Sequence, residues 1–248
     1  LETFNGSDRS HGDTFLSLWG RLFEVYGADL LRHFYPRDSG LLTVDREHPS
    51  GQLDAVLDFG TYVILIEFKA SLLTVAARCS RDIATFEAQF RRKFVENERG
   101  ERKGIRQLAD SANATLAGDL RFSVERPVIY PVLVCYEPSA DAFWMNRYAN
   151  EIFAQSVEGG VGERVRPLTL MSMEGLEMAL PYVAAGDFTW QTLFESRLSG
   201  NVVDERSVYQ AIYNWRAANN GTRRINAYLK ERFDRIFQTV MARYRGES

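Results

Sequence analysis

The residues best suited to chemistry lie in one short stretch, residues 52–69, which reads QLDAVLDFGTYVILIEFK. A Gly-Thr pair at residues 60–61 separates two apolar runs, and glycine at the first position of a two-residue loop suits a type II′ turn. A hairpin closed at this turn places Asp54 directly opposite Glu67. Because side chains alternate between the two faces of a strand, Lys69 shares the face of Glu67, and the opposite face of the hairpin is wholly apolar.

On that apolar face the predicted pairs are Phe59 with Tyr62, Leu57 with Ile64, Ala55 with Ile66 and Leu53 with Phe68. Opposed β-carbons lie about 5 Å apart in a sheet, so the carboxylates of Asp54 and Glu67 repel each other unless a cation lies between them. Mg²⁺, a hard cation that prefers oxygen ligands, suits this position. Gln52 falls opposite Lys69 on the same face. Asp58 competes as the metal-binding acid, but it lies beside the turn, so we favour Asp54.

Composition predicts one large folded domain, or a core with an appended subdomain, for the 248 residues. A hydrophobic fraction of 45% is enough to form a substantial core. No apolar run approaches the ~20 residues that a membrane span needs, and no signal-peptide pattern is present, so we expect no membrane partner. The two cysteines form no CxxC pair and the three histidines are widely spaced, which argues against a zinc site and is typical of a cytoplasmic protein.

Basic residues concentrate in two segments, although the net charge is −3. Residues 78–106 hold nine Lys and Arg against five acids, and residues 216–245 hold eight against two. Basic zones of this kind suit contacts with phosphate groups, the alternative being solvated helix faces with interspersed charge. In the first segment the candidates for such contacts are Arg91, Arg92, Lys103 and Arg106.

The elements around the hairpin predict an α/β fold. Helical spacing is found at residues 14–34, over most of 71–97, and at 104–117 and 172–180, whereas strands are expected at 41–44, 127–136 and 164–170, with a polar loop at 45–51. Pro131 cannot donate a ladder hydrogen bond, so it must lie at an edge or a bulge. This order predicts a mixed sheet flanked by helices.

A second candidate acid lies on the first predicted helix. The apolar spacing there predicts a buried face formed by Phe15, Leu18, Trp19, Leu22, Phe23, Tyr26 and Leu30. At about 100° per residue, Glu24 lies nearly opposite Phe15, on a stripe with Gly20, Gly27, Ala28 and Leu31. Small residues on this stripe would let the helix approach another surface closely around Glu24. The alternative is a solvent-exposed glutamate.

Asp54, twelve intervening residues and then Glu67-Phe68-Lys69 form a pattern that resembles the PD-(D/E)XK nuclease superfamily. The surrounding helices and strands are similar to its restriction-endonuclease-like fold. The resemblance covers about residues 14–180, so we expect a nuclease-like domain at residues 1–188 and a C-terminal helical extension at 189–248. Leu53 stands where the family often has a proline.

The resemblance implies metal-dependent hydrolysis of phosphodiester bonds in DNA. It implies that Asp54, Glu67 and the carbonyl oxygen of Phe68 hold Mg²⁺, for which Mn²⁺ can substitute. Lys69 would orient or help to deprotonate the attacking water. Many members also place a glutamate on the first helix, and residues 20–26 look like that motif, which assigns Glu24 to the site.

Some members place a glutamine on the helix that follows the acid-x-lysine strand. Gln107 looks similar, with Lys103 one turn earlier on the same side, and together they would orient the site or contact a phosphate. Ser111 stands where such members have a tyrosine, and the alternative is an ordinary exposed glutamine. The family suggests restriction or anti-phage defence, by analogy alone. The alternative is a catalytically silent nuclease-fold protein that binds nucleic acid or serves as an assembly subunit.

The C-terminal region is predicted to be helical from about residue 189. An Asn-Asn-Gly break at residues 219–221 separates two helices, and Thr222 is the expected cap of the second. That helix carries an apolar stripe formed by Ile225, Tyr228, Leu229, Phe233, Ile236, Phe237, Val240, Met241 and Tyr244. The stripe could pack on its own core or on another copy of the chain, giving a homodimer or a larger complex.

Overall fold

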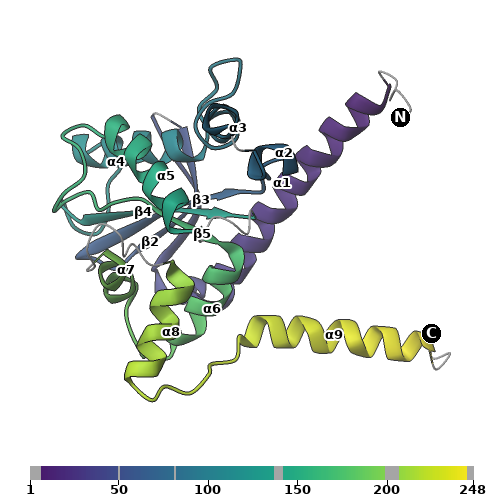
Figure 1. The fold of residues 1–248 in the computed structure, drawn as a ribbon. Coiled ribbons are helices and arrows are strands. Elements are labelled where there is room, and N and C mark those ends of the chain that lie inside the picture. The colour runs from purple at the N-terminus through teal and green to yellow at the C-terminus, as the bar shows by residue number, and fades with distance from the viewer. Residues whose placement is uncertain (1–6, 50, 81, 137–141, 199–206, 245–248) are drawn as a thin grey trace. The chain divides into compact units, whose positions relative to one another are not determined.

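The computed structural model describes residues 7–49, 51–80, 82–136, 142–198 and 207–244 of the 248-residue chain (Figure 1). The chain divides into two compact units, Leu1–Met173 and Glu174–Ser248. The boundary expected from the sequence lay later, between residues 188 and 189. In the described residues, no helix is long and apolar enough to cross a bilayer.

The first unit is built on a five-stranded mixed sheet, which agrees with the predicted α/β class. The strands lie in chain order, β1 to β3 are antiparallel, and β4 and β5 continue in parallel with β3. Their bounds are β1 Leu42–His48, β2 Gly51–Asp58, β3 Tyr62–Lys69, β4 Val128–Cys135 and β5 Thr169–Ser172. The helices of this unit are α1 Ser7–Phe34, α2 Val75–Arg78, α3 Ile83–Phe94, α4 Gly104–Ala117 and α5 Phe143–Ser156, with a 3₁₀ turn η1 at Arg37–Ser39.

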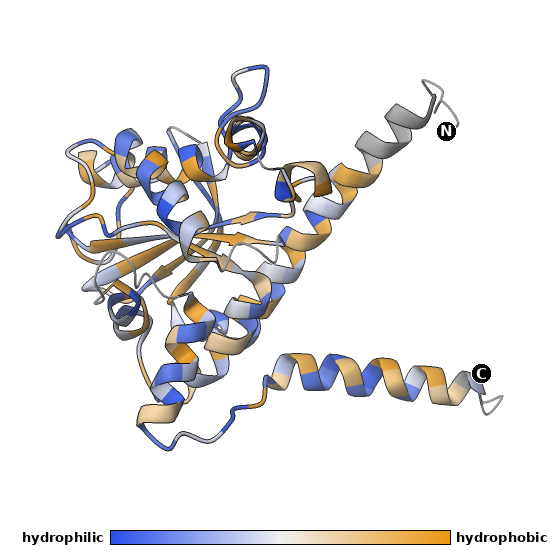
Figure 2. Ribbon diagram, in the orientation of Figure 1, coloured by the Kyte–Doolittle hydropathy of each residue, from blue (hydrophilic) through white to orange (hydrophobic). Residues whose placement is uncertain are grey.

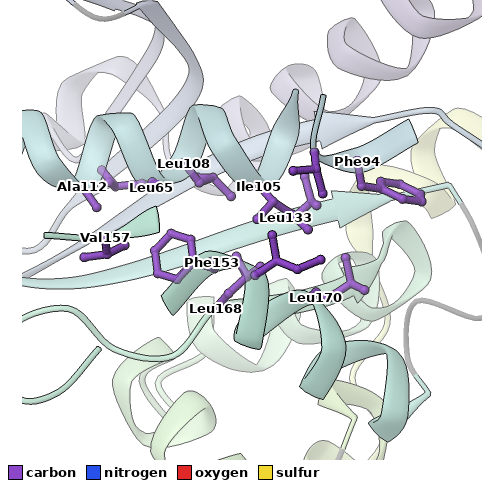
Figure 3. Close-up of a cluster of buried hydrophobic side chains, with 14 of the residues drawn as sticks. Leu65, Phe94, Ile105, Leu108, Ala112, Leu133, Phe153, Val157, Leu168 and Leu170 are labelled. Atoms are coloured by element: carbon purple, nitrogen blue, oxygen red, sulfur yellow. The ribbon is translucent and has the colours of Figure 1, made fainter. Parts of the chain in front are cut away.

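Strand β3 is buried on both faces, because helices cover the sheet from both sides (Figure 1). Hydrophobic residues dominate the central strands (Figure 2). On one face the residues of β3 and β4 pack against α4 and α5. The labelled residues of this core include Leu65, Leu133, Ile105, Leu108, Ala112, Phe153 and Val157 (Figure 3). The bounds of α4 and its apolar face agree with those predicted from the sequence.

Strand β1 is longer than predicted, because residues 45–48 were expected to form a loop. Arg46, Glu47 and His48 instead pair with residues of β2. An edge strand has one unpaired side, so polar residues that alternate with partly buried ones are compatible with it. The prediction was wrong because a polar segment next to a hairpin was taken for a turn.

Pro131 lies in the interior strand β4 and not at an edge of the sheet. Ile129 donates its amide hydrogen to a residue on the β5 side, and alternate residues of a strand point the same way, so Pro131 faces β5 too. The pairing on that side is offset by one residue between Ile129–Val165 and Val132–Thr169. The missing N–H of the proline therefore falls at an interruption of the ladder, as a bulge would require.

Helix α1 buries only part of the predicted face: Phe23 and Leu30 are buried as expected, together with Ala28 and Leu31 of the other stripe. Phe15, Leu18 and Leu22 are 53% to 62% exposed, and the N-terminal half of the helix extends past the sheet (Figure 1). The stripe that contains Gly27 faces β3 instead. A β-carbon at Gly27 would lie 2.8 Å or less from the ring carbons of Phe68. The absence of a side chain is thus what lets α1 lie directly on this ring.

The second unit consists of helices α6 Met173–Ala184, α7 Trp190–Leu198, α8 Val208–Ala218 and α9 Ala227–Tyr244. Tyr182 stacks on Phe188, and Trp215 of α8 packs edge-on against both rings. The cap of α9 is not Thr222 as predicted. Asn226 accepts the amide hydrogen of Leu229 at 3.2 Å, because the helix begins later than the Asn-Asn-Gly break suggests.

The close packing of α1 on β3 can be tested with two glycines of the same helix. We expect Gly27→Ala to lower the free energy of unfolding by about 1–3 kcal/mol, the usual cost of overpacking a core. Gly20→Ala is the matched control, because no atom lies within 4 Å of a β-carbon there. It should stabilise the protein by up to about 1 kcal/mol, since alanine is the better helix former. Urea unfolding measures both; equal changes would contradict the packing.

Candidate active site

The hairpin forms in the predicted register. Ala55 pairs with Ile66, Leu57 with Ile64, and the amide of Phe59 donates to the carbonyl of Tyr62 at 3.0 Å. Gly60 has a φ of 80°, and the amide of Thr61 donates to the carbonyl of Phe59 at 3.1 Å, which is the hydrogen-bond pattern of a γ-turn and not the predicted type II′ turn. The hairpin prediction is therefore confirmed over these pairs.

The regular pairing of β2 with β3 ends at Ala55 and Ile66, just before the charged residues. Beyond it, the amide of Phe68 donates to Oδ2 of Asp54 at 2.7 Å, so a side chain takes the place of a ladder acceptor. Because the N–H and C=O of a strand residue point the same way, the carbonyl of Phe68 faces the Asp54 side. This brings together the groups expected to bind a metal.

Glu67 lies at the centre of the site and is fully buried. Neither of its carboxylate oxygens has a hydrogen-bond partner of good geometry among the described residues. The Nζ atom of Lys69 lies 3.2 Å from Oε2 and forms an ion pair with it. Buried polar atoms nearly always have partners, so these two oxygens mark a place where a cation could bind.

The acids of the site resist ionisation. Burial, together with the nearby charge of Asp54, raises the pKa of Glu67 to about 8 against the lowering effect of Lys69. Burial also raises the pKa of Asp54 above its usual value. Burial alone would lower the pKa of Lys69, but the surrounding carboxylates outweigh it and raise that pKa, so the lysine stays an ammonium.

Glu24 approaches this group from α1. It is half-buried, and its pKa is raised by burial and by the charge of Asp54, partly offset by Lys69. The structure therefore brings Glu24 near the other candidate residues. The close contact of Gly27 with Phe68, one turn further along the helix, explains how α1 comes near enough.

Asp45 belongs to the same electrostatic group and was missed in the sequence, where it was placed in a loop. It raises the pKa of both Asp54 and Glu24. Asp45 has a left-handed φ of 54° and interrupts the pairing of β1 with β2 opposite Asp54. Gln52 donates to Oδ1 of Asp45 at 3.4 Å, so its amide is directed there and not toward Lys69 as the register suggested. Only strand pairing of β1 could have revealed this acid.

Asp58 lies at the opposite end of the hairpin from Glu67. Its carboxylate accepts hydrogen bonds from the amide of Gly60 at 2.9 Å and from the amide and hydroxyl of Ser123 at 2.8 Å each. These bonds fasten the hairpin turn to the loop before β4. Asp58 therefore has a structural role, which leaves Asp54 as the acid beside Glu67.

The donor set fits a magnesium ion that keeps part of its water shell. Asp54, Glu67 and the carbonyl of Phe68 supply oxygen ligands, and Mg²⁺ commonly binds one or two carboxylates while retaining several waters. The fit is supported by the buried oxygens of Glu67, which accept no hydrogen bond of good geometry from the described residues although Oε2 is ion-paired with Lys69. Among the described residues, no group of three or more His, Cys, Asp or Glu side chains is close enough to enclose a metal.

Helix α4 supplies the remaining candidates on the face of β3 that carries Lys69. A β-carbon at Gly104 would lie 3.1 Å from Cγ of Lys69, so the start of α4 lies against the lysine stem. Lys103 directly precedes this glycine. Gln107, one turn later, is half-buried, and within the described residues its side chain makes no hydrogen bond.

Ser111, which stands in place of the family's tyrosine, is fully buried. Its hydroxyl donates to the carbonyl of Gln107 at 2.8 Å and lies 2.9 Å from Nε2 of His48. The neutral imidazole would then donate to the serine, and burial lowers the pKa of His48, which favours that neutral form. These hydrogen bonds link β1 to α4, so Ser111 has a structural role.

The basic candidates differ in their surroundings. Arg106 reaches Ser156 of α5 at 3.3 Å and Glu96 at 3.8 Å, which directs it into the fold. Arg92 forms an ion pair with Glu98 at 3.2 Å, and Arg91 is exposed on α3. The structure thus leaves Arg91, Arg92 and Lys103 on accessible surface and gives Arg106 an internal contact.

Comparison with known proteins adds no relative to this picture. No protein-family model matches the chain, and neither a curated protein nor a solved structure matches it.

The raised pKa of Glu67 predicts how stability depends on pH. An acid with a higher pKa in the folded than in the unfolded state destabilises the fold as pH rises between those values, here from 4.5 to about 8. We expect Glu67→Gln to stabilise the protein more at pH 8 than at pH 5, by at least about 1 kcal/mol, since one pKa unit corresponds to about 1.4 kcal/mol. Chemical unfolding with EDTA present measures this difference.

The control for that measurement is Glu47→Gln, which removes an exposed carboxylate of β1. Its effect on the free energy of unfolding should be the same at both pH values. If Glu67→Gln also showed no pH dependence, Glu67 would be ionised throughout the range and the site would not suppress its charge.

Proposed function

We propose that this protein is a metal-dependent nuclease that hydrolyses phosphodiester bonds in DNA. The observation that carries the proposal is the buried carboxylate of Glu67, whose oxygens lack hydrogen-bond partners beside Asp54 and Lys69. The ion pair with Lys69 compensates only part of this burial, because Asp54 adds a second carboxylate beside a single ammonium, and desolvating an incompletely compensated carboxylate costs several kcal/mol. A divalent cation and a phosphate together would satisfy both the acids and the lysine.

Each residue would have a distinct role. Asp54, Glu67 and the carbonyl of Phe68 would hold Mg²⁺ or Mn²⁺. The bound ion would polarise the scissile phosphate and lower the pKa of a water molecule. Lys69, kept as an ammonium by the surrounding acids, is suited to stabilising charge that develops on the phosphate oxygens. Glu24 is half-buried with a raised pKa, which suits a group that accepts a proton from the attacking water.

The restriction-endonuclease-like fold is part of the same proposal. It is supported by an antiparallel hairpin joined to two parallel strands, with a long helix on one face and α4 and α5 on the other. Restriction or anti-phage defence would use such an enzyme. A catalytically silent protein that binds nucleic acid is the second candidate. Calorimetric titration with Mn²⁺ separates the two. The enzyme must bind the metal, and Asp54→Asn should weaken that binding.

DNA cleavage tests the proposed function most directly. We expect purified protein with Mg²⁺ or Mn²⁺ to cut DNA, and Asp54→Asn or Lys69→Met to reduce the rate at least about 100-fold, the usual loss when a charge-stabilising group is removed. Asp58→Asn is the matched control, because it lies on the same hairpin but contacts only the turn and Ser123. It should keep most of the activity.

Two results would refute the enzyme reading. The first is wild-type protein that cuts no form of DNA with any divalent ion, and the second is Lys69→Met protein that cuts as fast as wild type. Circular dichroism of each variant would separate loss of chemistry from loss of folding. Asparagine at position 54 keeps an oxygen acceptor for the amide of Phe68, so the end of the hairpin should remain intact.

The apolar stripe of α9 suggests that the chain associates with a second copy. Apolar and charged residues alternate along this helix (Figure 2), and the side chains of Phe233, Ile236, Phe237 and Val240 are 50% to 67% exposed. Spacings of three and four residues place these side chains on one side of the helix. Two such helices from separate chains would cover each other's stripes, which would give the homodimer.

We expect Phe237→Lys to shift the protein from dimer to monomer, because a buried ammonium would replace a ring at the centre of the stripe. Gln238→Lys introduces the same group on the other side of α9, where it stays in solvent, and should leave the dimer intact. Light scattering over a range of protein concentrations measures both. A monomeric wild type, or two variants with equal mass, would rule out this interface.

A further inference from the structure

A small basic pocket lies close to the site, at the end of α3 and along the loop that leads into α4. It has a volume of about 290 Å³ and is lined by Arg92, Lys93, Asn97, Glu98, Arg99 and Lys103. Four of these six residues are cations and one is an acid. Like charges gathered in one hollow repel each other, so the arrangement favours binding of an anion.

The loop that forms the pocket is held in a defined shape. The amide of Lys103 donates to the carbonyl of Val95 at 2.8 Å and closes the loop at its base. At the tip, Oδ1 of Asn97 accepts the amide hydrogens of Arg99 and Glu101, at 3.0 Å each. The cations are therefore positioned by the backbone before any ligand arrives, which lowers the entropy cost of binding.

The acids nearby are already engaged by other groups. Glu98 pairs with Arg92, Glu101 accepts from the side chain of Asn97, and Glu96 lies near Arg106. In the part of the chain that the structure describes, no acid forms an ion pair with Lys93, Arg99 or Lys103. These three cations are the ones available to an incoming anion.

Lys93 shows the effect of this crowding. It is partly buried, and burial together with the charges of Arg92 and Lys103 lowers its pKa. An anion placed among these groups would relieve that repulsion. The first turn of α4, which Lys103 leaves without a side-chain cap, adds the partial positive charge of a helix N-terminus.

The pocket is connected to the site through two consecutive residues. Lys103 lines the pocket, and the next residue, Gly104, lies against the stem of Lys69. An extended polyanion bound at Lys69 would therefore pass close to the pocket. Repeated phosphates of one strand could occupy both places at once, whereas a single free phosphate could occupy only one.

We propose that this pocket binds one backbone phosphate of the nucleic-acid strand that the site cleaves, away from the scissile phosphate. The inference rests on the proposed nuclease function and adds Lys93 and Arg99 to the residues that hold the substrate. Such a contact fixes the position of the strand without reading its bases. The pocket should therefore bind the backbone of DNA equally well whatever its base sequence.

Salt dependence of binding tests the pocket, because each phosphate contact contributes about 0.9 to the slope of log K against log salt on duplex DNA. Binding of a fluorescein-labelled duplex would be followed by anisotropy in Ca²⁺, between about 50 and 200 mM salt. We expect Lys93→Gln/Arg99→Gln to weaken binding about tenfold and to reduce the slope by about 1, equally for unrelated sequences.

The control is Arg37→Gln/Arg126→Gln, which removes the same charge from exposed positions near the other end of the sheet. It should leave the slope unchanged. If the pocket variant keeps the wild-type slope while wild-type protein still cleaves DNA, the pocket inference fails and the nuclease function stands.

Inorganic phosphate separates the two sources of the anion. If calorimetry shows that phosphate binds to wild type but not to Lys93→Gln/Arg99→Gln, while the DNA slope is equal in both, the pocket serves a free phosphate and the inference is overturned. If wild-type protein neither binds nor cuts DNA, the nuclease function fails together with it. Loss of slope in the pocket variant, with folding retained by circular dichroism, supports the inference.

Discussion

The structure of the first unit depends on how the carboxylate of Glu67 is buried. A charged group in a sheet covered on both sides needs neighbours that compensate for lost hydration. Lys69 supplies one charge, and the regular β2–β3 ladder ends one residue before Glu67. The short hairpin pairing, the close approach of α1 and the bare glycine at the start of α4 all act around this one group.

Burial also explains why the site combines acids with a lysine. Two carboxylates alone would raise each other's pKa until one became neutral. The ammonium limits that effect without removing it, so both acids keep raised pKa values. In the proposed nuclease the metal ligands must be deprotonated, so affinity for the ion would increase with pH over the range in which Glu67 titrates.

Much of this arrangement could be read from the sequence, and the failures have physical reasons. Alternation and turn chemistry specify the hairpin register, because a slip of one residue would move every apolar side chain to the other face. The buried face of α1 was predicted only in part: Phe23 and Leu30 are buried as expected, but the contact between the stripe of small residues and the ring of Phe68 arises from tertiary packing, which leaves no local pattern. Asp45, Lys93 and Arg99 were missed because strand pairing and loop closure bring them into place, and neither leaves a local pattern.

The end of the hairpin ladder has a further consequence for how this site could arise or be lost. In a regular ladder the backbone carbonyls already accept hydrogen bonds from the neighbouring strand. A sheet can therefore offer a carbonyl to a ligand only where the ladder ends or is interrupted. One more pair of ladder bonds, between Leu53 and Phe68, would engage the carbonyl of Phe68 and displace the side chain of Asp54. The same acids would then be present without a free backbone carbonyl beside them. If the site binds a metal as proposed, that ability depends on the interrupted ladder as much as on the identity of the side chains.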